Sequence, residues 1–240
     1  MCHSWTRKVY NKMIAAGPYT VQGVMLGGVG DGGPGSLDAS VVSVFVCPSD
    51  GLPSPAVGQI PGTNSYLGLS SYRGSMSGKD PSDPQYGTDG VIVNGVTGSV
   101  RITDITDGTS NTLMFGEHNN VDPNWPAWAA VFAPVIASDP SVPYWVLGST
   151  WTTQILFDQA GTAGSLNALL PSSAGDFSTT SFYVLSARAS SFGSRHTGGA
   201  NFTLADGSVR FISNAVNSNP TVLPALATRA GGEVIDPSAY

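Results

Sequence analysis

The sequence predicts an α+β domain built around an antiparallel sheet, and its composition and patterning favour this fold class. The 240 residues include 30 glycines and 17 prolines but only 11% charged residues, whereas soluble domains average about 25%. Short β-type runs bounded by turn signals recur along the chain, and helical spacing is confined to its two ends. A surface rich in Ser, Thr, Asn and Gly is typical of an extracellular β-rich protein with long polar loops.

The first expected element is a short amphipathic helix over residues 6–16. Apolar residues from Val9 to Ile14 are spaced as on one helical face, and Gly17-Pro18 ends the pattern. The glycine-rich segment 23–35 follows, and we expect a flexible loop there because glycine loses the most freedom when it is ordered.

The middle of the chain predicts short strands among long loops. Residues 41–46 are a β-type run closed by the turn sequence of residues 47–51. The segment 52–98 is rich in Gly, Pro, Ser and Asn, so we expect it to be dominated by loops, with one small strand at 90–96. A further strand is expected at 112–115, after an Asp-Gly turn.

The C-terminal part carries the sharpest local signal, a β-hairpin. Runs over 200–205 and 208–212 are separated by Asp206-Gly207, the composition that a two-residue type I′ turn prefers because both central residues need positive φ. This register would place four apolar residues on one face: Phe202, Leu204, Val209 and Phe211. A last helix is expected over 220–230, ending at Gly231-Gly232.

We predict a single domain over residues 1–240 with a loop-rich insertion at about 118–190. The insertion carries four of the five tryptophans but no long helical or alternating pattern. Its tryptophans could line a carbohydrate or peptide groove, because aromatic faces favour such contacts. Packing in the core or under loops is the alternative. The candidate binding residues are Trp125, Trp128, Trp145 and Trp151.

Charge and cysteine content exclude several classes of protein. A net charge of −6 and a pI near 4.7 oppose binding to nucleic-acid phosphates. No run approaches the roughly 18 apolar residues needed to span a bilayer. The two cysteines, Cys2 and Cys47, leave both a disulfide and two free thiols open. Neither lies in a CxxC motif, so the sequence gives little support to a redox or zinc function.

Several ordered segments carry a family resemblance. They are residues 45–50, residues 105–117, His196 followed after nine residues by Asp206-Gly207, and residues 226–233. Over about residues 9–233 the chain resembles a bacterial family of prepilin-like proteins with an N-terminal cleavage/methylation segment and a C-terminal "H, nine residues, DG" motif. That family is a domain of unknown function that is also labelled solute-binding-protein-like.

The resemblance implies a pilin-like (pseudopilin-like) globular head, exported and displayed at the cell envelope. Its expected partners are other pilin-like subunits or a surface ligand. Members of the family usually begin with a prepilin leader and a long hydrophobic helix, which the first residues here do not match. We therefore expect a helix remnant at 6–16 and predict no membrane insertion through it.

Two sets of polar residues have both a functional and a structural interpretation. His196 and Asp206 suggest metal ligands or an acid–base pair, but Asp206-Gly207 is also what a hairpin turn demands, and His196 could simply bond a neighbouring loop. Asp104 and Asp107 begin an oxygen-rich loop, and oxygen is what calcium prefers. Type II secretion pseudopilins hold calcium in a loop of the head. The same residue types, however, satisfy backbone groups in turns.

No catalytic residues are predicted. The sequence lacks a Gly-x-Ser-x-Gly motif, and Glu117 and His118 are neighbours that point to opposite faces of a strand. We therefore expect a non-catalytic surface protein whose head serves assembly or recognition, with calcium as its one candidate cofactor. A solute- or glycan-binding module with a Trp-rich site is the alternative, followed by a glycoside-type hydrolase with a distant carboxylate pair.

Overall fold

A computed structural model describes most of the chain from residue 39 onward. The described residues are 35, 39–59, 66–79, 83–93, 99–136, 149–150, 159–162, 164–175 and 179–240. The expected helix at 6–16 and nearly all of the glycine-rich segment lie outside them. Within them, no helix has the length and apolar character that crossing a bilayer requires.

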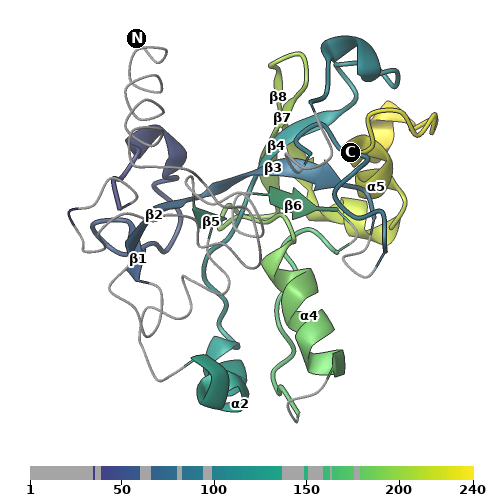
Figure 1. Cartoon of the computed structure of the whole chain (residues 1–240). Helices are drawn as coiled ribbons and strands as arrows, with labels where there is room; N and C mark the ends of the chain where they lie inside the picture. The colour runs from purple at the N-terminus through teal and green to yellow at the C-terminus, as the bar shows by residue number, and fades with distance from the viewer. Residues whose placement is uncertain are drawn as a thin grey trace.

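The centre of the molecule is a five-stranded sheet in the order β6-β3-β4-β7-β8 (Figure 1). Its strands are β3 (Tyr72–Ser77), β4 (Leu113–Glu117), β6 (Gln159–Gly161), β7 (Gly199–Leu204) and β8 (Val209–Ser213). All neighbours pair antiparallel except β3 and β6, which are parallel. The predicted α+β class with an antiparallel sheet is confirmed, and so is the strand expected around 112–115.

A smaller antiparallel sheet lies beside the first and is joined to it through Ser71. Its strands are β1 (Val57–Gln59), β2 (Tyr66–Ser70) and β5 (Ser149–Thr150). Only Ser71 separates β2 from β3. The Ser71 backbone N–H donates to the carbonyl of Phe45 at 2.7 Å, and its carbonyl accepts the N–H of His118 at 2.8 Å. The junction is thus tied to two other segments of the chain.

The segment 52–98 holds more strands than the single one expected, because β1, β2 and β3 lie within it. Small residues in β3 let another segment approach the strand closely, since a Cβ on Gly74 would lie 2.7 Å from the side chain of Ile92. The strand expected at 90–96 is absent from its described part, where Ile92 donates to Ser75 without forming a regular strand.

The strand expected at 41–46 is also wrong. Residues Ser43–Phe45 form a 3-10 helix instead, with the Phe45 N–H donating to Val42 and the Val46 N–H to Ser43. Local bonds therefore replace strand pairing. The turn that follows is confirmed by a bond from the Asp50 N–H to the Cys47 carbonyl.

The β7–β8 hairpin is confirmed, but its turn is one residue longer than predicted. Leu204 pairs with Ser208, the Gly207 N–H donates to the Leu204 carbonyl, and of the turn residues only Gly207 has positive φ, at +86°. This is a three-residue turn with a bulge. The extra residue shifts the register by one, so Val209 and Phe211 point to the face opposite that of Leu204.

Helix α5 (Val222–Ala227) covers one face of the five-stranded sheet. The helix expected over 220–230 is confirmed with shorter bounds. Its residue Leu226 is fully buried in the main core, which also contains Phe202, Leu204 and Ile212 from the hairpin. The other face, called the open face below, is not covered by α5. It carries Tyr72, Phe115, Glu117, Asn201, Thr203, Val209 and Phe211.

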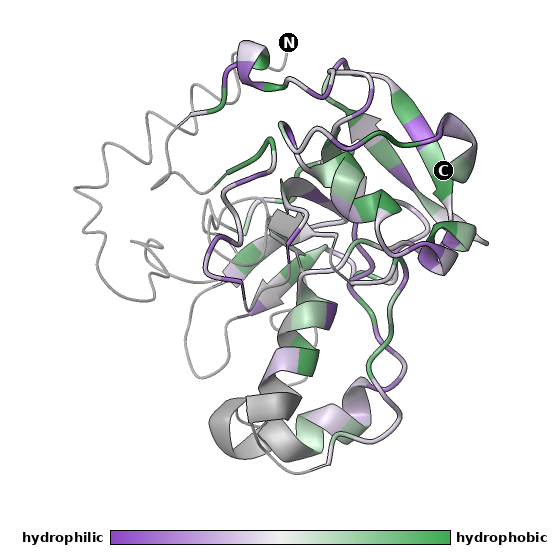
Figure 2. Cartoon of the chain, turned by 90° about the vertical axis from the view of Figure 1, so that its right-hand side faces the viewer, coloured by the Kyte–Doolittle hydropathy of each residue, from purple (hydrophilic) through white to green (hydrophobic). Residues whose placement is uncertain are grey.

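Two helices lie inside the segment that was predicted to be loop-rich. Helix α2 (Trp125–Ile136) and α4 (Thr179–Ala189) lie together at one end of the molecule (Figures 1 and 2). Their sequences hide the helical pattern, because α2 is apolar almost throughout and α4 is rich in Ser and Thr. A buried ion pair, Arg188 Nε to Asp122 Oδ2 at 2.9 Å, fixes α4.

Candidate functional site

Glu117 is a buried carboxylate at the end of β4, on the open face of the sheet. It pairs with Tyr72 of β3, and its side chain is only 4% exposed. Burying an ionised carboxylate is costly unless it is hydrogen-bonded. Both the backbone N–H of Asn201, at 2.7 Å, and its side-chain amide, at 3.2 Å, donate to Oε2. The other oxygen, Oε1, lies 3.1 Å from Nε2 of His196.

His196 belongs to the loop that precedes β7. Its backbone N–H donates to the Ser194 hydroxyl at 3.1 Å, and that hydroxyl donates to the Gly199 carbonyl at 2.7 Å. These bonds shape the loop so that the ring lies over the end of β4. The side chain is 34% exposed, so the imidazole is far more open to solvent than its partner Glu117.

Cys47 provides a third group from a distant part of the chain. Its thiol sulfur lies 3.6 Å from His196 Nε2. The Cys47 backbone N–H donates to the Ser71 hydroxyl at 3.0 Å, and that hydroxyl donates to Asp50 Oδ2 at 2.8 Å. Asn120 donates to the same carboxylate oxygen. Cys47 is a buried free thiol, and Cys2 lies outside the described residues.

The cluster of Cys47, Glu117 and His196 brings a sulfur, a carboxylate oxygen and an imidazole nitrogen within 4.8 Å of one another. Among the described residues, it is the one group of three or more such side chains close enough to share an ion. Each member belongs to one of the segments that carry the family resemblance. Separations of up to 149 residues explain why no local pattern predicted their meeting.

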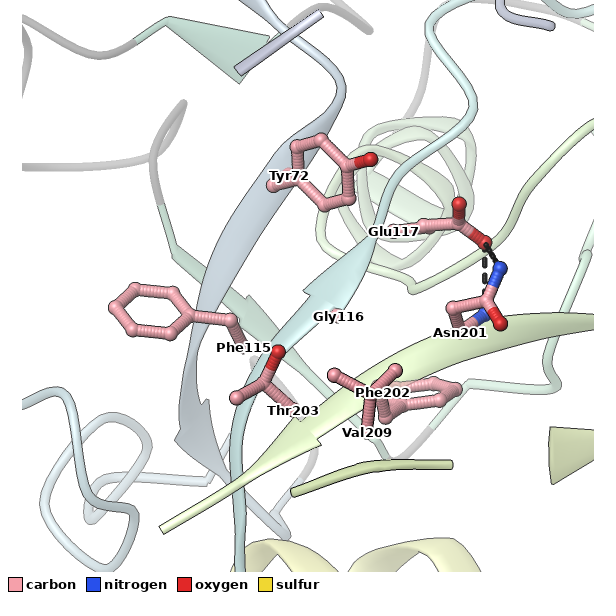
Figure 3. A pocket seen from close by; sticks show the side chains of 8 residues that line it. All are labelled: Tyr72, Phe115, Gly116, Glu117, Asn201, Phe202, Thr203 and Val209. Carbon is pink, nitrogen blue, oxygen red and sulfur yellow. Dashed lines mark hydrogen bonds between the residues drawn. The ribbon is translucent and has the colours of Figure 1, made fainter. Parts of the chain in front are cut away.

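A pocket of about 340 Å³ opens beside Glu117 on the open face (Figure 3). It is lined by Tyr72, Phe115, Gly116, Glu117, Asn201, Phe202, Thr203 and Val209. Burial raises the pKa of the Tyr72 phenol above its ordinary value, and the neighbouring Cys47 and Glu117 raise it further. The phenol also forms a side-chain hydrogen bond with Cys47, which ties Tyr72 to the same cluster.

Trp125 and Trp128 do not line this pocket. Trp125 and Trp128, both in α2, are buried in a small core with Leu170 and Leu185. The indole N–H of Trp128 donates to the carbonyl of Pro171 at 2.8 Å. Their rings serve packing in this structure. Trp145 and Trp151 lie outside the described residues.

The two aspartates of the calcium prediction bond to backbone groups. Asp104 accepts the N–H of Arg101 at 2.8 Å. The two oxygens of Asp107 accept the N–H groups of Gly232 and Gly231 at 3.0 and 2.7 Å. These contacts are the turn-stabilising role that was weighed against calcium, and calcium binding stays a prediction.

His196 and Asp206 are not brought together. Asp206 lies at the tip of the hairpin, where Oδ1 accepts the N–H and the hydroxyl of Ser208 at 2.8 and 2.7 Å. These bonds lower the pKa of the Asp206 carboxyl. The partners of His196 are Glu117 and Cys47, neither of which was singled out from the sequence as a site residue. His118 points elsewhere, with Nδ1 2.7 Å from the Ser191 carbonyl.

The fold and the site define an α+β domain with a half-covered sheet, a shallow pocket on its open face and a Cys–Glu–His cluster at the pocket's edge. The chain belongs to a family described as "Protein of unknown function (DUF1559)", whose model matches residues 8–219. The family's short label is of the solute-binding-protein type, which suggests an exported or surface protein. No curated protein and no solved structure matches the chain.

Proposed function

We propose that this chain is the non-catalytic recognition head of an exported surface protein, and that it binds a small solute in the pocket on the open face. The observation that carries the proposal is the pocket itself. Its volume, about 340 Å³, falls in the range of roughly 300–1,000 Å³ that is usual for small-ligand sites.

The lining of the pocket suits a solute with an apolar body and a few polar groups. Phe115 and Val209 offer apolar surface, while the Thr203 hydroxyl offers hydrogen bonds. Such a mixture of apolar walls with a few fixed polar groups is typical of binding sites. The family label supports the same class of function.

The contacts of Glu117 favour binding over catalysis. A general base must reach a substrate proton with a free oxygen, but Oε2 already accepts two bonds from Asn201 and Oε1 faces His196. In a catalytic triad, the nucleophile and the acid contact different ring nitrogens of the histidine that acts as the base. Here the Cys47 sulfur and the Glu117 carboxylate both approach Nε2.

A thermal-shift screen of the full chain against sugars, amino acids and short peptides tests the proposal. We expect at least one class of solute to raise the melting temperature of the natural chain and of a control variant, Val234→Trp, at a fully exposed position. The same solute should leave Thr203→Trp unchanged, because the indole fills the pocket. Equal stabilisation of all three proteins, or consumption of the solute on incubation, would contradict the proposal.

Assembly with pilin-like subunits is a second candidate function. The observation that favours it is the exposed apolar surface of the open face, where Phe115 is 39%, Val209 65% and Phe211 49% exposed. Single exposed apolar residues are common, but a contiguous group is typical of an interaction surface. Sedimentation equilibrium of the full chain tests it: self-association that Val209→Thr abolishes supports assembly, and a monomer at all concentrations contradicts it for this chain alone.

A further inference from the structure

We propose that Cys47, Glu117 and His196 form a zinc-binding site at the edge of the five-stranded sheet. The ligand types carry the first step of the argument. Thiolate, imidazole and carboxylate are the three side-chain groups that bind Zn²⁺ in proteins. The soft thiolate selects against magnesium and calcium, which take oxygen ligands.

The distances agree with a shared ion. Bond lengths of about 2.0–2.3 Å in a tetrahedral site place the ligand atoms roughly 3.3–3.8 Å apart. The observed separations are 3.6 Å between Cys47 Sγ and His196 Nε2 and 3.1 Å between that nitrogen and Glu117 Oε1. All three ligand atoms lie within 4.8 Å of one another. Small shifts of the side chains, without a change of rotamer, would therefore let all three bind one ion.

The supporting bonds point to a built site. Asn201 holds Oε2 of Glu117 through two hydrogen bonds and so aims Oε1 at the cluster. Ser71 holds the backbone of Cys47, and Ser194 holds the backbone of His196. Outer groups of this kind orient the ligands of metal sites.

Cys47 and Glu117 approach the same ring nitrogen of His196, which favours a metal site over a thiol catalytic triad. In a triad the cysteine and the acid contact different ring nitrogens, because the histidine passes a proton between them. The Cys47 sulfur and the Glu117 oxygen instead share Nε2. A neutral imidazole binds a metal through a ring nitrogen, and here Nε2 is the nitrogen that lies next to both other ligand groups.

Three protein ligands leave one coordination position for water or for an exogenous group, as in zinc sites that exchange ligands. Glu117 also lines the pocket, so the ion would lie at the pocket's edge. The zinc site does not depend on the proposed solute binding, because the ion is held by the three side chains alone.

Zinc affinity is measured by competition with a chromogenic chelator, using a Cys2→Ser/His3→Ala chain as the reference, since its N-terminal cysteine and histidine could bind metal themselves. We expect one zinc per chain. Replacing zinc by cobalt should give a thiolate-to-metal charge-transfer band. Cys47→Ser should abolish that band and weaken zinc binding at least about 100-fold, the upper end of what losing a supporting residue costs.

His196→Gln is the second ligand variant, and it should fold because His196 is partly exposed. It should lose zinc binding to a similar degree. Asn201→Ala should weaken binding about tenfold, since its backbone bond to Glu117 survives. The matched control is Asp104→Asn/Asp107→Asn, which should bind zinc unchanged. Equal zinc affinity in the reference, Cys47→Ser and His196→Gln chains, or no zinc bound by the reference chain, would overturn the proposal.

Discussion

The two faces of the five-stranded sheet belong to the same strands but are stabilised by different interactions. On the covered face, Phe202, Leu204 and Ile212 are at most 1% exposed and pack with α5. On the open face, the neighbouring positions include Glu117 and Asn201, joined by hydrogen bonds. Since successive side chains of a strand alternate between faces, the sheet has one side that packs against α5 and one side that α5 leaves uncovered.

Substitutions on the two faces should therefore change different properties of the protein. Loss of an apolar residue from the covered face leaves a cavity, and its cost falls on stability. Loss of a group from the open face removes contacts that solvent can replace, so its cost should fall on binding. The predictions below test this division, in order of decreasing effect on stability.

The largest effect is expected for Phe202→Ala on the covered face. Its ring packs edge-on against Phe192, with centroids 5.2 Å apart and an interplanar angle of 69°. Truncating a buried phenylalanine costs about 3–5 kcal/mol, and this should appear as a lower urea midpoint with an unchanged slope. A loss below about 1 kcal/mol would show that α5 does not seal this face.

The next effect is stabilisation by zinc on the open face. At a free concentration one hundred times its dissociation constant, a ligand that binds only the folded state adds about 2.7 kcal/mol. For a chain of this size each kcal/mol raises Tm by roughly 2–4 °C. The increase should disappear in His196→Gln and on addition of a chelator. An equal increase in His196→Gln would place the ion elsewhere.

A smaller loss is expected for Gly116→Ala, the glycine of β4 that faces the core. A Cβ there would lie 2.6 Å from the rings of both Phe192 and Phe202, closer than such atoms approach. Overpacking of this kind costs about 1–3 kcal/mol. Adding Phe192→Leu should recover part of the loss, and no recovery would mean that the Phe192 contact does not contribute to it. Chemical denaturation measures both variants.

The smallest effect is expected for Phe211→Thr on the open face. Phe211 is 49% exposed, and surface substitutions usually change stability by no more than about 0.5 kcal/mol. Its neighbour Ile212 is fully buried, so Ile212→Thr is the matched control and should be far more destabilising. If thermal denaturation showed equal losses of stability for the two variants, the register predicted from a two-residue turn would be favoured instead.

The hairpin shows which structural features local sequence can predict and which it cannot. Asp206-Gly207 located the turn correctly, because only glycine adopts positive φ easily. It did not decide between a two-residue turn and a three-residue turn with a bulge, since both place glycine near the end of the loop. That one residue decides the face of Val209 and Phe211. In the folded chain, the longer turn places Ile212 in the same core as Leu226 of α5, and local sequence does not contain that contact.

The candidate site was less accessible to prediction than the fold. Glu117 and Cys47 lie 79 and 149 residues before His196 in the sequence. They meet only through strand pairing together with the loop contacts that hold Cys47 and His196. The tryptophans attracted attention by residue type, but Trp125 and Trp128 belong to a buried core. In the strands β2 and β3, many glycines and serines concealed the β pattern, because small residues are also common in loops.

The Ser71 junction has a consequence for which residues the chain tolerates. Its hydroxyl accepts from Cys47 and donates to Asp50, while its backbone bonds Phe45 and His118. Alanine would leave the Cys47 N–H without this bond and would remove one of the two side-chain bonds to Asp50 Oδ2. A larger residue would find no room at a position 1% exposed. Position 71 should therefore have one of the shortest lists of acceptable amino acids in the chain, although serine is usually among the most replaceable residues.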